Sequence, residues 1–291
     1  MRKSFTAKLV VAFLAGLATA VVLAPFVAVA VARLGFHFPF PRIFDRVVMI
    51  ALALVLILWA QELKLVSLLR TGFAGPVANF AFTARGLLVA LGVMVVLFLV
   101  ASVMEGLPSA GHAARLLPKY ALSAVVIAVI EEAFFRAFLL GGMQGDFGST
   151  GALIVSSTIY ALAHLLRAPA RFYAPSLDLT AGVRTLGLSF SQLSAPLSAL
   201  PTLIGLFLLG VVLAEAFLLT GTVWFSVGLH AGFVVGAKLW PKMMVTRHGL
   251  PGWLAGWGRQ PLISGAAAWV AALAVLLLLR ALAGTRRERA A

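Results

Sequence analysis

Long apolar runs make up most of the chain, and short segments rich in Gly, Pro and charged residues separate them. A helix that crosses a bilayer needs about 20 mainly apolar residues, with a range of about 17–25. Runs of roughly this length lie at residues 7–32, 46–68, 83–104, 119–143, 149–166, 199–219, 221–240 and 262–283. The pattern therefore predicts an all-α fold, a polytopic transmembrane helical bundle of about eight spans.

The connections between these runs differ in length. The sequence GGMQGDFGST joins the fourth and fifth runs tightly, and LTGT joins the sixth and seventh. The long connection, residues 167–198, mixes prolines, charges and apolar residues, so we expect it to hold an interfacial helix or a lid. The sequence predicts no separate soluble domain.

The overall composition supports the membrane assignment. Hydrophobic residues make up 62% of the chain and charged residues 11%, with a mean hydropathy of +1.07, so the bilayer has to act as the solvent for most of it. The net charge of +14 comes mostly from Lys and Arg between the apolar runs, where anionic lipid headgroups are the ordinary partner rather than nucleic acid. Without cysteine, the chain has no disulfide, no thiolate nucleophile and no Cys-based metal site. We expect a multi-pass protein of a bacterial inner (cytoplasmic) membrane.

A few titratable residues interrupt the apolar runs. Glu131, Glu132 and Arg136 lie in the fourth run, His164 near the end of the fifth, and His230 in the middle of the seventh. A charge at the centre of a bilayer costs about 2.5–3.5 kcal/mol on insertion scales, so such residues usually face the interior of a bundle and act there. We therefore expect an active site inside the bundle.

The spacing of the charges in the fourth run suggests different roles for the two glutamates. Glu132 and Arg136 are four residues apart on one helix face, where an ion pair forms naturally. Glu131 is rotated by about 100° around the helix from Glu132, so it is the carboxylate that remains available for a catalytic role. Purely structural roles are the alternatives: an ion pair that locks two helices, an interfacial His164, and a His230 that only hydrogen-bonds within the core.

Three motifs in order carry a family resemblance. EEAFFR begins at Glu131, and SSTIYALAH ends at His164 with Tyr160 in a position usually held by Phe. The third block, LLGVVLAEAFLLTGTVWFSVGLHAGFV, contains His230. Together they resemble the CAAX protease and bacteriocin-processing family of intramembrane proteases (CPBP, also called ABI). On this basis we divide the chain into N-terminal transmembrane helices (1–118), a CPBP-like protease core (119–240) and a loop with a C-terminal helix and basic tail (241–291).

The resemblance implies peptide-bond hydrolysis by an activated water. Glu131 is then the general base, His164 orients the water or protonates the leaving amine, and His230 binds the developing oxyanion. Glu132 and Arg136 hold the helix in register, with Tyr160 beside them. No cofactor is required. Zinc bound by Glu131, His164 and His230 is the alternative, although the chain lacks the short HExxH ligand spacing.

One position departs from the family pattern. The last motif is usually HxxxN or HxxxD, whereas this chain has Val234 four residues after His230. Loss of one oxyanion donor typically lowers a rate by about 10²–10³. Two other functions therefore remain open: a non-catalytic membrane scaffold of the same fold, and a proton-coupled transporter in which Glu131, His164 and His230 relay protons. For a protease, the expected partners are the lipid bilayer and a membrane-associated or lipidated peptide, in CAAX-type or leader (bacteriocin) processing.

Overall fold

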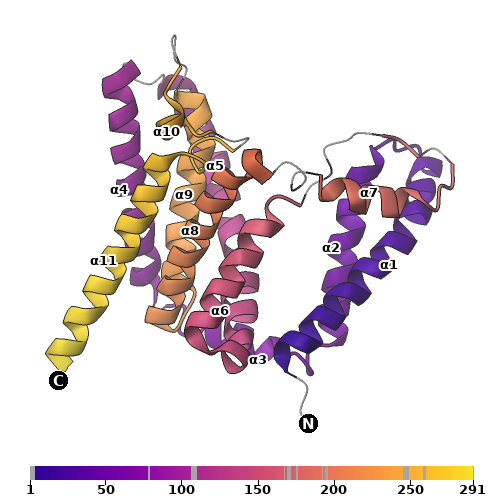
Figure 1. The fold of residues 1–291 in the computed structure, drawn as a ribbon, viewed down its shortest axis with the longest axis horizontal. Helices are drawn as coiled ribbons and strands as arrows, with labels where there is room; N and C mark the ends of the chain where they lie inside the picture. The colour runs from indigo at the N-terminus through magenta and orange to yellow at the C-terminus, as the bar shows by residue number, and fades with distance from the viewer. Residues whose placement is uncertain are drawn as a thin grey trace. The chain divides into compact units, whose positions relative to one another are not determined.

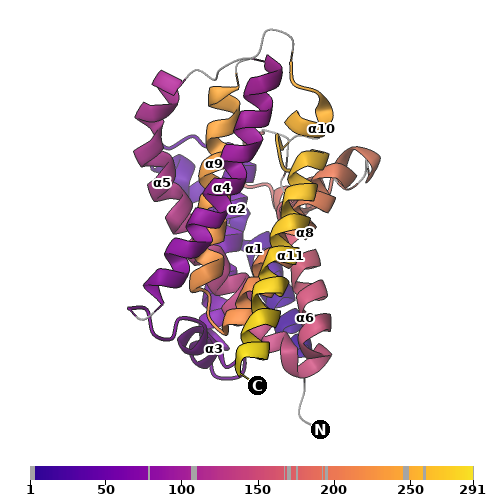
Figure 2. The same ribbon diagram turned by 90° about the vertical axis from the view of Figure 1, so that its left-hand side faces the viewer.

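The structure, a computed structural model, describes residues 4–290 except 78, 106–109, 167, 169–171, 175, 192, 194–195, 245–248 and 258–259. Throughout these residues the secondary structure is helical, without strands (Figures 1 and 2). The elements are α1 (Phe5–Arg33), α2 (Phe40–Leu58), α3 (Leu65–Gly72), α4 (Phe80–Glu105), α5 (Ala110–Glu132), the π-helix η1 (Ala133–Leu140), α6 (Gly141–Ala163), α7 (Ala181–Ser189), α8 (Pro196–Thr220), α9 (Trp224–Met243), α10 (Gly252–Ala255) and α11 (Ala266–Ala290). The predicted fold class, a polytopic helical bundle, is confirmed.

Contacts between residues divide the chain into two compact units. Unit 1 comprises Met1–Ser67 and Ala163–Pro196, and unit 2 comprises Leu68–Leu162 and Leu197–Ala291. The motifs divide the chain differently, into residues 1–118, 119–240 and 241–291, and that division stays a prediction.

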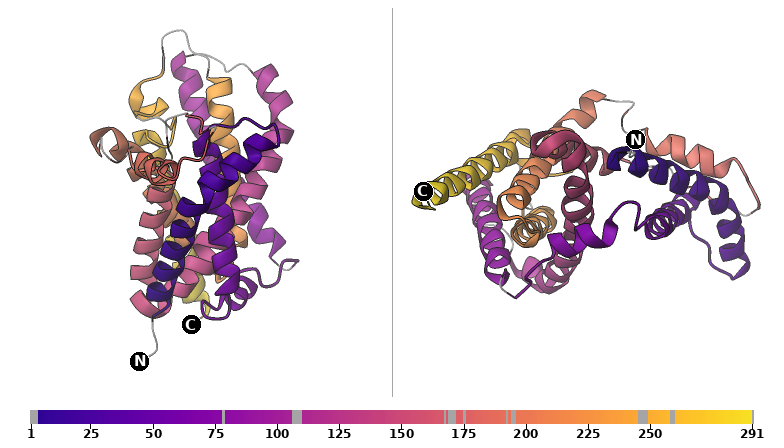
Figure 3. Two further views of the ribbon diagram at one scale, coloured as in Figure 1. Left: turned by 90° about the vertical axis from the view of Figure 1, so that its right-hand side faces the viewer. Right: turned by 90° about the horizontal axis from the view of Figure 1, so that it is seen from below.

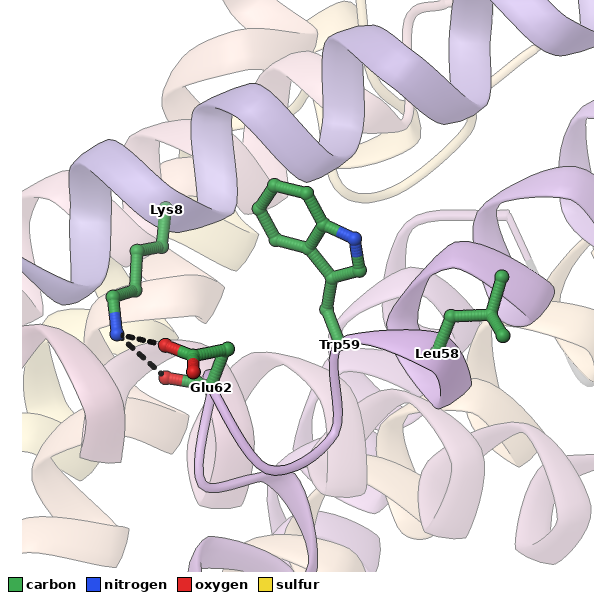
Figure 4. A pocket seen from close by; sticks show the side chains of 4 residues that line it. All are labelled: Lys8, Leu58, Trp59 and Glu62. Carbon is green, nitrogen blue, oxygen red and sulfur yellow. Dashed lines mark hydrogen bonds and ion pairs between the residues drawn. The ribbon is translucent and has the colours of Figure 1, made fainter.

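Unit 1 is built on the pairing of α1 and α2. Small residues on α1 let the helices approach closely, because a Cβ added at Gly16 would lie 2.7 Å from a methyl carbon of Leu52. Helix α7 packs across α1 with Gly182 against the backbone of Val21. At the other end of the pair, a pocket of about 390 Å³ is lined by Lys8, Leu58, Trp59 and Glu62, and Lys8 forms an ion pair with Glu62 there (Figure 4).

Unit 2 contains all the helices that carry the glutamate pair and His230. Helices α8 and α9 lie in its middle, with α4, α5, α6 and α11 around them (Figure 3, right). Three glycines one turn apart, at 228, 232 and 236, form the face of α9 that packs on α4. A Cβ at Gly228 would lie only 2.0 Å from the carbonyl oxygen of Thr83, so the two backbones are in direct contact. Such close approach of small residues is the usual way in which helices associate within a bilayer.

The observed helices refine the predicted spans. Among the residues that the structure describes, three helical segments are long and apolar enough to cross a membrane by length and composition alone: Phe5–Arg33, Phe80–Met104 and Leu197–Thr220. The second span was wrongly bounded: α2 begins six residues before 46 and ends at Leu58, because the chain turns before Lys64, which adopts a left-handed φ of 51°. The tight connection after the fourth run is present, since Gly148 has a φ of 66° and breaks α6 there. The long connection holds a helix, α7, as expected.

Candidate active site

The glutamate pair lies on the last turn of α5, at the point where α9 crosses it in unit 2. Glu131 and Glu132 are the final residues before the π-helix η1, and His230 is in the first half of α9. His230 contacts both carboxylates, so two residues from α5 and one from α9 form a single cluster. In the sequence, His230 has no charged residue near it on its own helix. Its charged neighbours, Glu131 and Glu132, come from α5.

Glu132 is the fully buried member of the pair. Its side chain has no exposed surface, and its two oxygens face different partners. Oε1 lies 2.9 Å from His230 Nδ1, and Oε2 lies 3.3 Å from Arg136 Nε. The ion pair expected four residues along the helix is therefore present, and it also includes a histidine. A buried carboxylate is stable only with such partners, because an uncompensated charge in an apolar interior costs several kcal/mol, of order 3–5.

Arg136 joins three helices of unit 2. It is 2% exposed, and its Nη2 donates a hydrogen bond of 3.2 Å to the carbonyl oxygen of Gly210 on α8. Its guanidinium lies 4.8 Å from the ring centroid of Tyr160 on α6, a cation–π distance. Tyr160 in turn packs edge-on against Phe135, with ring centroids 5.0 Å apart. Arg136 thus fixes Glu132 while holding η1 to α6 and α8.

Glu131 is placed differently from its neighbour. Its side chain is 25% exposed, and its Oε2 lies 3.7 Å from Nε2 of His230. That distance is too long for a direct hydrogen bond, and the contact is an ion pair only when the imidazole is protonated. Of the two side chains, that of Glu131 is therefore the partly exposed one, although its Oε2, which faces His230, is itself buried.

The orientation of His230 follows from its contact with Glu132. Because that carboxylate accepts, Nδ1 carries a proton and donates it, which leaves Nε2 facing Glu131. Tyr160 lies edge-on to the imidazole with ring centroids 6.3 Å apart, and Ser226, one turn earlier on α9, also reaches the Glu132 carboxylate. The ring is thus held from several sides with one nitrogen directed at the exposed carboxylate.

A π-helix follows the two glutamates directly. Residues Ala133–Leu140 form η1, although the sequence pattern predicted an ordinary α-helix. A π-helix widens the turn, and short π-helical segments occur often at functional sites. Because η1 carries Arg136, its wider turn sets where the guanidinium meets Glu132 and the carbonyl of Gly210.

Two further predicted residues are His164 and Val234. His164 follows the end of α6 within Ala163–Pro196 and so belongs to unit 1, and its role beside the glutamates stays a prediction. Val234 lies one turn beyond His230 on α9 and is partly buried, with an aliphatic side chain that supplies no donor.

Comparison with known proteins gives one match. Residues 113–236 match the family described as type II CAAX prenyl endopeptidase Rce1-like. This region of the chain is Rce1-like. The resemblance seen in the motifs is thereby confirmed. No curated protein and no solved structure matches the chain.

The Rce1-like region contains every element of the cluster. It runs from α5 through η1, α6 and α8 to most of α9, and so includes both glutamates, Arg136 and His230. The match supports a CAAX-type intramembrane endopeptidase at the level of the family, and together with the apolar helices it indicates an integral membrane protein. It does not assign a role to any residue.

The cluster in the Rce1-like region does not fit a zinc site. Within the described ranges, no group of three His, Asp or Glu side chains is arranged so that it could hold a metal ion. Both ring nitrogens of His230 already face carboxylates. The arrangement resembles a hydrogen-bonded charge network more than the open tetrahedral ligand set that zinc prefers.

Sequence reasoning missed several contributors to the site. Phe135 is a neighbour of Arg136 in sequence, but its packing on Tyr160 depends on η1. Ser226 lies four residues before His230, so the helical period alone could have placed it on the same face. The Gly210 carbonyl could not have been found from sequence, because a backbone acceptor leaves no residue-type signal.

Proposed function

We propose that this protein is an intramembrane endopeptidase that hydrolyses a peptide bond of a membrane-associated or lipidated peptide with a water activated by Glu131. The observation that carries the proposal is the contrast between the two glutamates. Glu132 is buried and contacts both His230 and Arg136, whereas Glu131 is partly exposed and faces the histidine nitrogen that Glu132 does not contact. One carboxylate is thus positioned for structure and its neighbour for proton transfer.

In the proposed reaction, Glu131 removes a proton from a water molecule as that water attacks the scissile carbonyl carbon. A carbon–oxygen bond forms, and the carbonyl oxygen becomes an oxyanion. Because Nδ1–H is donated to Glu132, Nε2 of His230 can donate a hydrogen bond to this oxyanion when the imidazole is in its doubly protonated, cationic form. The proton then passes from Glu131, or through His164, to the departing amine as the carbon–nitrogen bond breaks. No covalent intermediate is formed.

Arg136 and Tyr160 act as positioning residues in this proposal. Arg136 pairs with Glu132 and fixes its position, and Glu132 orients the imidazole of His230. In other enzymes, too, a buried carboxylate orients a histidine by accepting a hydrogen bond from one of its ring nitrogens. Val234 removes a side-chain donor from the oxyanion site, so the rate is expected to be low.

Two observations favour other functions. Val234 supports a non-catalytic scaffold of the Rce1-like fold. A buried network of Glu131, Glu132 and His230 also suits a proton-coupled transporter, since intramembrane carboxylates and histidines are typical of proton relays. Neither alternative explains why one carboxylate is left partly exposed beside the ring nitrogen of His230 that Glu132 does not contact.

The test is cleavage of a quenched fluorescent peptide library by the purified protein in liposomes. The wild type is compared with Glu131→Ala and Val234→Asn, each with and without a chelator. Cleavage that is lost in Glu131→Ala, survives chelation and rises by about 10²–10³ in Val234→Asn supports the proposal. Loss of activity with chelator would favour zinc. Activity found only in Val234→Asn would indicate a scaffold, and proton-coupled flux that depends on Glu131 without cleavage would indicate a transporter.

A further inference from the structure

The pocket of unit 1 lies at the level where a bilayer has its headgroups. It is formed between the start of α1, which carries Lys8, and the end of α2 with the turn that follows it. Helix α1 has 29 residues, which span about 43 Å at about 1.5 Å per residue. A bilayer with its headgroup layers is about 40–45 Å thick. Both ends of α1 therefore reach the headgroups, and the pocket opens at one of these ends.

The pocket contains one charge of each sign and an aromatic ring. The ammonium of Lys8 donates to the carboxylate of Glu62 and to the backbone carbonyl of the same residue. Figure 4 shows the indole of Trp59 between this ion pair and Leu58. Among the residues that the structure describes, neither Lys8 nor Glu62 contacts a further charged group. The two charges balance, so the pocket complements a ligand that also carries one charge of each sign.

Both charged groups keep hydrogen-bonding capacity for such a ligand. An ammonium has three donors, and Lys8 uses two of them on Glu62. The carboxylate of Glu62 bonds Lys8 through Oε2, and its side chain is 68% exposed. The face of an indole attracts cations more strongly than the other aromatic rings do. The pocket can therefore add an anion at Lys8 and a cation between Glu62 and Trp59 while the ion pair stays in place.

The turn that carries Trp59 and Glu62 is held by its own backbone. The amide of Leu63 donates to the carbonyl oxygen of Trp59, and the amide of Leu65 donates to that of Ala60, each over 2.9 Å. Leu63 is fully buried and anchors the turn. Trp59 and Glu62 are thus presented on a preformed segment, which lowers the entropic cost of binding.

An exposed apolar stripe continues from the pocket. Ile50, Leu54 and Leu58 follow one another on α2 at intervals of four residues, so they share one face of the helix, and each is more than half exposed. Leu58 lines the pocket, and because α2 packs along α1, the stripe runs from there toward the middle of the bilayer. The charged pocket and the apolar stripe therefore follow each other in the same order as the headgroup and acyl chain of a phospholipid.

We infer that this pocket binds the headgroup of a zwitterionic phospholipid with a primary ammonium, of the phosphatidylethanolamine type. The phosphate accepts from Lys8, and the ammonium donates to Glu62 and lies against the indole of Trp59. An anionic headgroup is disfavoured by the carboxylate of Glu62, and a choline headgroup has no N–H to donate to it. The inference goes beyond the proposed peptidase function and does not depend on it.

The test follows lipid binding at Trp59 itself. The full-length protein is labelled with 5-fluorotryptophan in maltoside micelles, and the fluorine NMR signal that is missing in Trp59→Phe belongs to Trp59. Dihexanoyl phospholipids with ethanolamine, choline or glycerol headgroups are then titrated in. We expect the ethanolamine lipid to bind with a Kd about tenfold lower than the other two, which corresponds to about 1.4 kcal/mol. Glycerophosphoethanolamine, which has the same headgroup without acyl chains, should bind at least about tenfold more weakly than the ethanolamine lipid.

Variants separate the contributions of the two charges. Glu62→Gln keeps the size of the side chain but removes its charge, and it should raise the Kd of the ethanolamine lipid to that of the choline lipid. Lys8→Met should weaken all the phospholipids, because each carries a phosphate. Asp178→Asn is the matched control: it removes the charge from another exposed ion pair of unit 1, with Arg184, and should leave every Kd unchanged.

Several outcomes would overturn the inference. Equal Kd values for the three lipids, or an ethanolamine preference that survives Glu62→Gln, rule out recognition of the ammonium by Glu62. A preference for the glycerol headgroup would assign the pocket to anionic lipid at Lys8 alone. Binding of glycerophosphoethanolamine as tight as that of the lipid would assign it to a soluble ligand. None of these results depends on cleavage, so a failure of the proposed peptidase function is seen separately.

Discussion

Helix α9 presents two faces with opposite character. Toward α4 it offers only apolar residues here: Gly228 and Gly232 bring the two backbones close together, Gly236 lies against the side chain of Met94, and Trp240 packs on Phe98. Toward α5 it offers His230 and Lys238, each with a polar partner. The first face stabilises the helix position by close contact, and the second uses that fixed position to align chemical groups. The difference shows that a site inside a bilayer needs an apolar, tightly packed face behind it.

The largest expected effect comes from removing the buried charge on the α5 side. Glu132→Ala leaves Arg136 buried with its ion-pair partner gone, and it also frees the imidazole of His230. Breaking a buried pair in this way costs about 3–5 kcal/mol. We expect a strongly lowered melting temperature in detergent together with loss of cleavage. A variant as stable as the wild type would mean that Glu132 is not the centre of the network.

In the proposed mechanism, His230→Ala removes the residue of α9 that binds the oxyanion. The expected result is a fall in kcat of about 10²–10³, the usual effect of deleting one oxyanion donor. Stability should fall less than in Glu132→Ala, because Glu132 keeps Arg136. Single-turnover cleavage and a melting curve measure the two effects, and an unchanged kcat would exclude His230 from the chemistry.

Gly228→Ala tests the opposite face. The added methyl would lie 2.0 Å from the carbonyl oxygen of Thr83, so α4 and α9 have to separate. Such overpacking typically costs about 1–3 kcal/mol, and the shift of α9 should also lower cleavage. Gly92→Ala on α4 is the matched control, because an added Cβ there meets nothing within 4 Å. If both variants melt alike, the glycine face does not set the position of α9.

The smallest expected effect lies in unit 1, far in sequence from the site. A hydrogen bond from Lys8, and next its positive charge, lowers the pKa of Glu62 below its ordinary value of 4.5. Because the folded-state pKa is the lower one, the stabilisation from this pair is present above about pH 4.5 and is lost as the pH falls through the folded-state pKa. Lys8→Met should move the Glu62 pKa back up toward 4.5 in a carbon-detected NMR titration, with no change in cleavage at neutral pH. An unmoved pKa would show that the ion pair does not form in the membrane.

The sequence alone determined the class of the protein and the identity of most of its polar core. Uninterrupted apolar runs can be solvated only by lipid, and in lipid the backbone has to satisfy its own hydrogen bonds, so helices follow from composition. The spacing of Glu132 and Arg136 predicted their ion pair, because residues four apart on a helix are neighbours on its surface. The three motifs pointed to the family that the comparison found.

Only the tertiary structure decided how the polar residues share their partners. That His230 meets both glutamates depends on where α9 crosses α5, over about one hundred residues of intervening chain, and no local pattern encodes that crossing. The sequence likewise could not predict the π-helix η1 or the hydrogen bond from Arg136 to the Gly210 carbonyl, because backbone geometry and backbone acceptors do not depend on a recognisable residue type. The two glutamates differ in exposure, 25% for Glu131 and 0% for Glu132. Adjacent residues on a helix point in different directions, and only the surrounding helices determine which of the two side chains they cover.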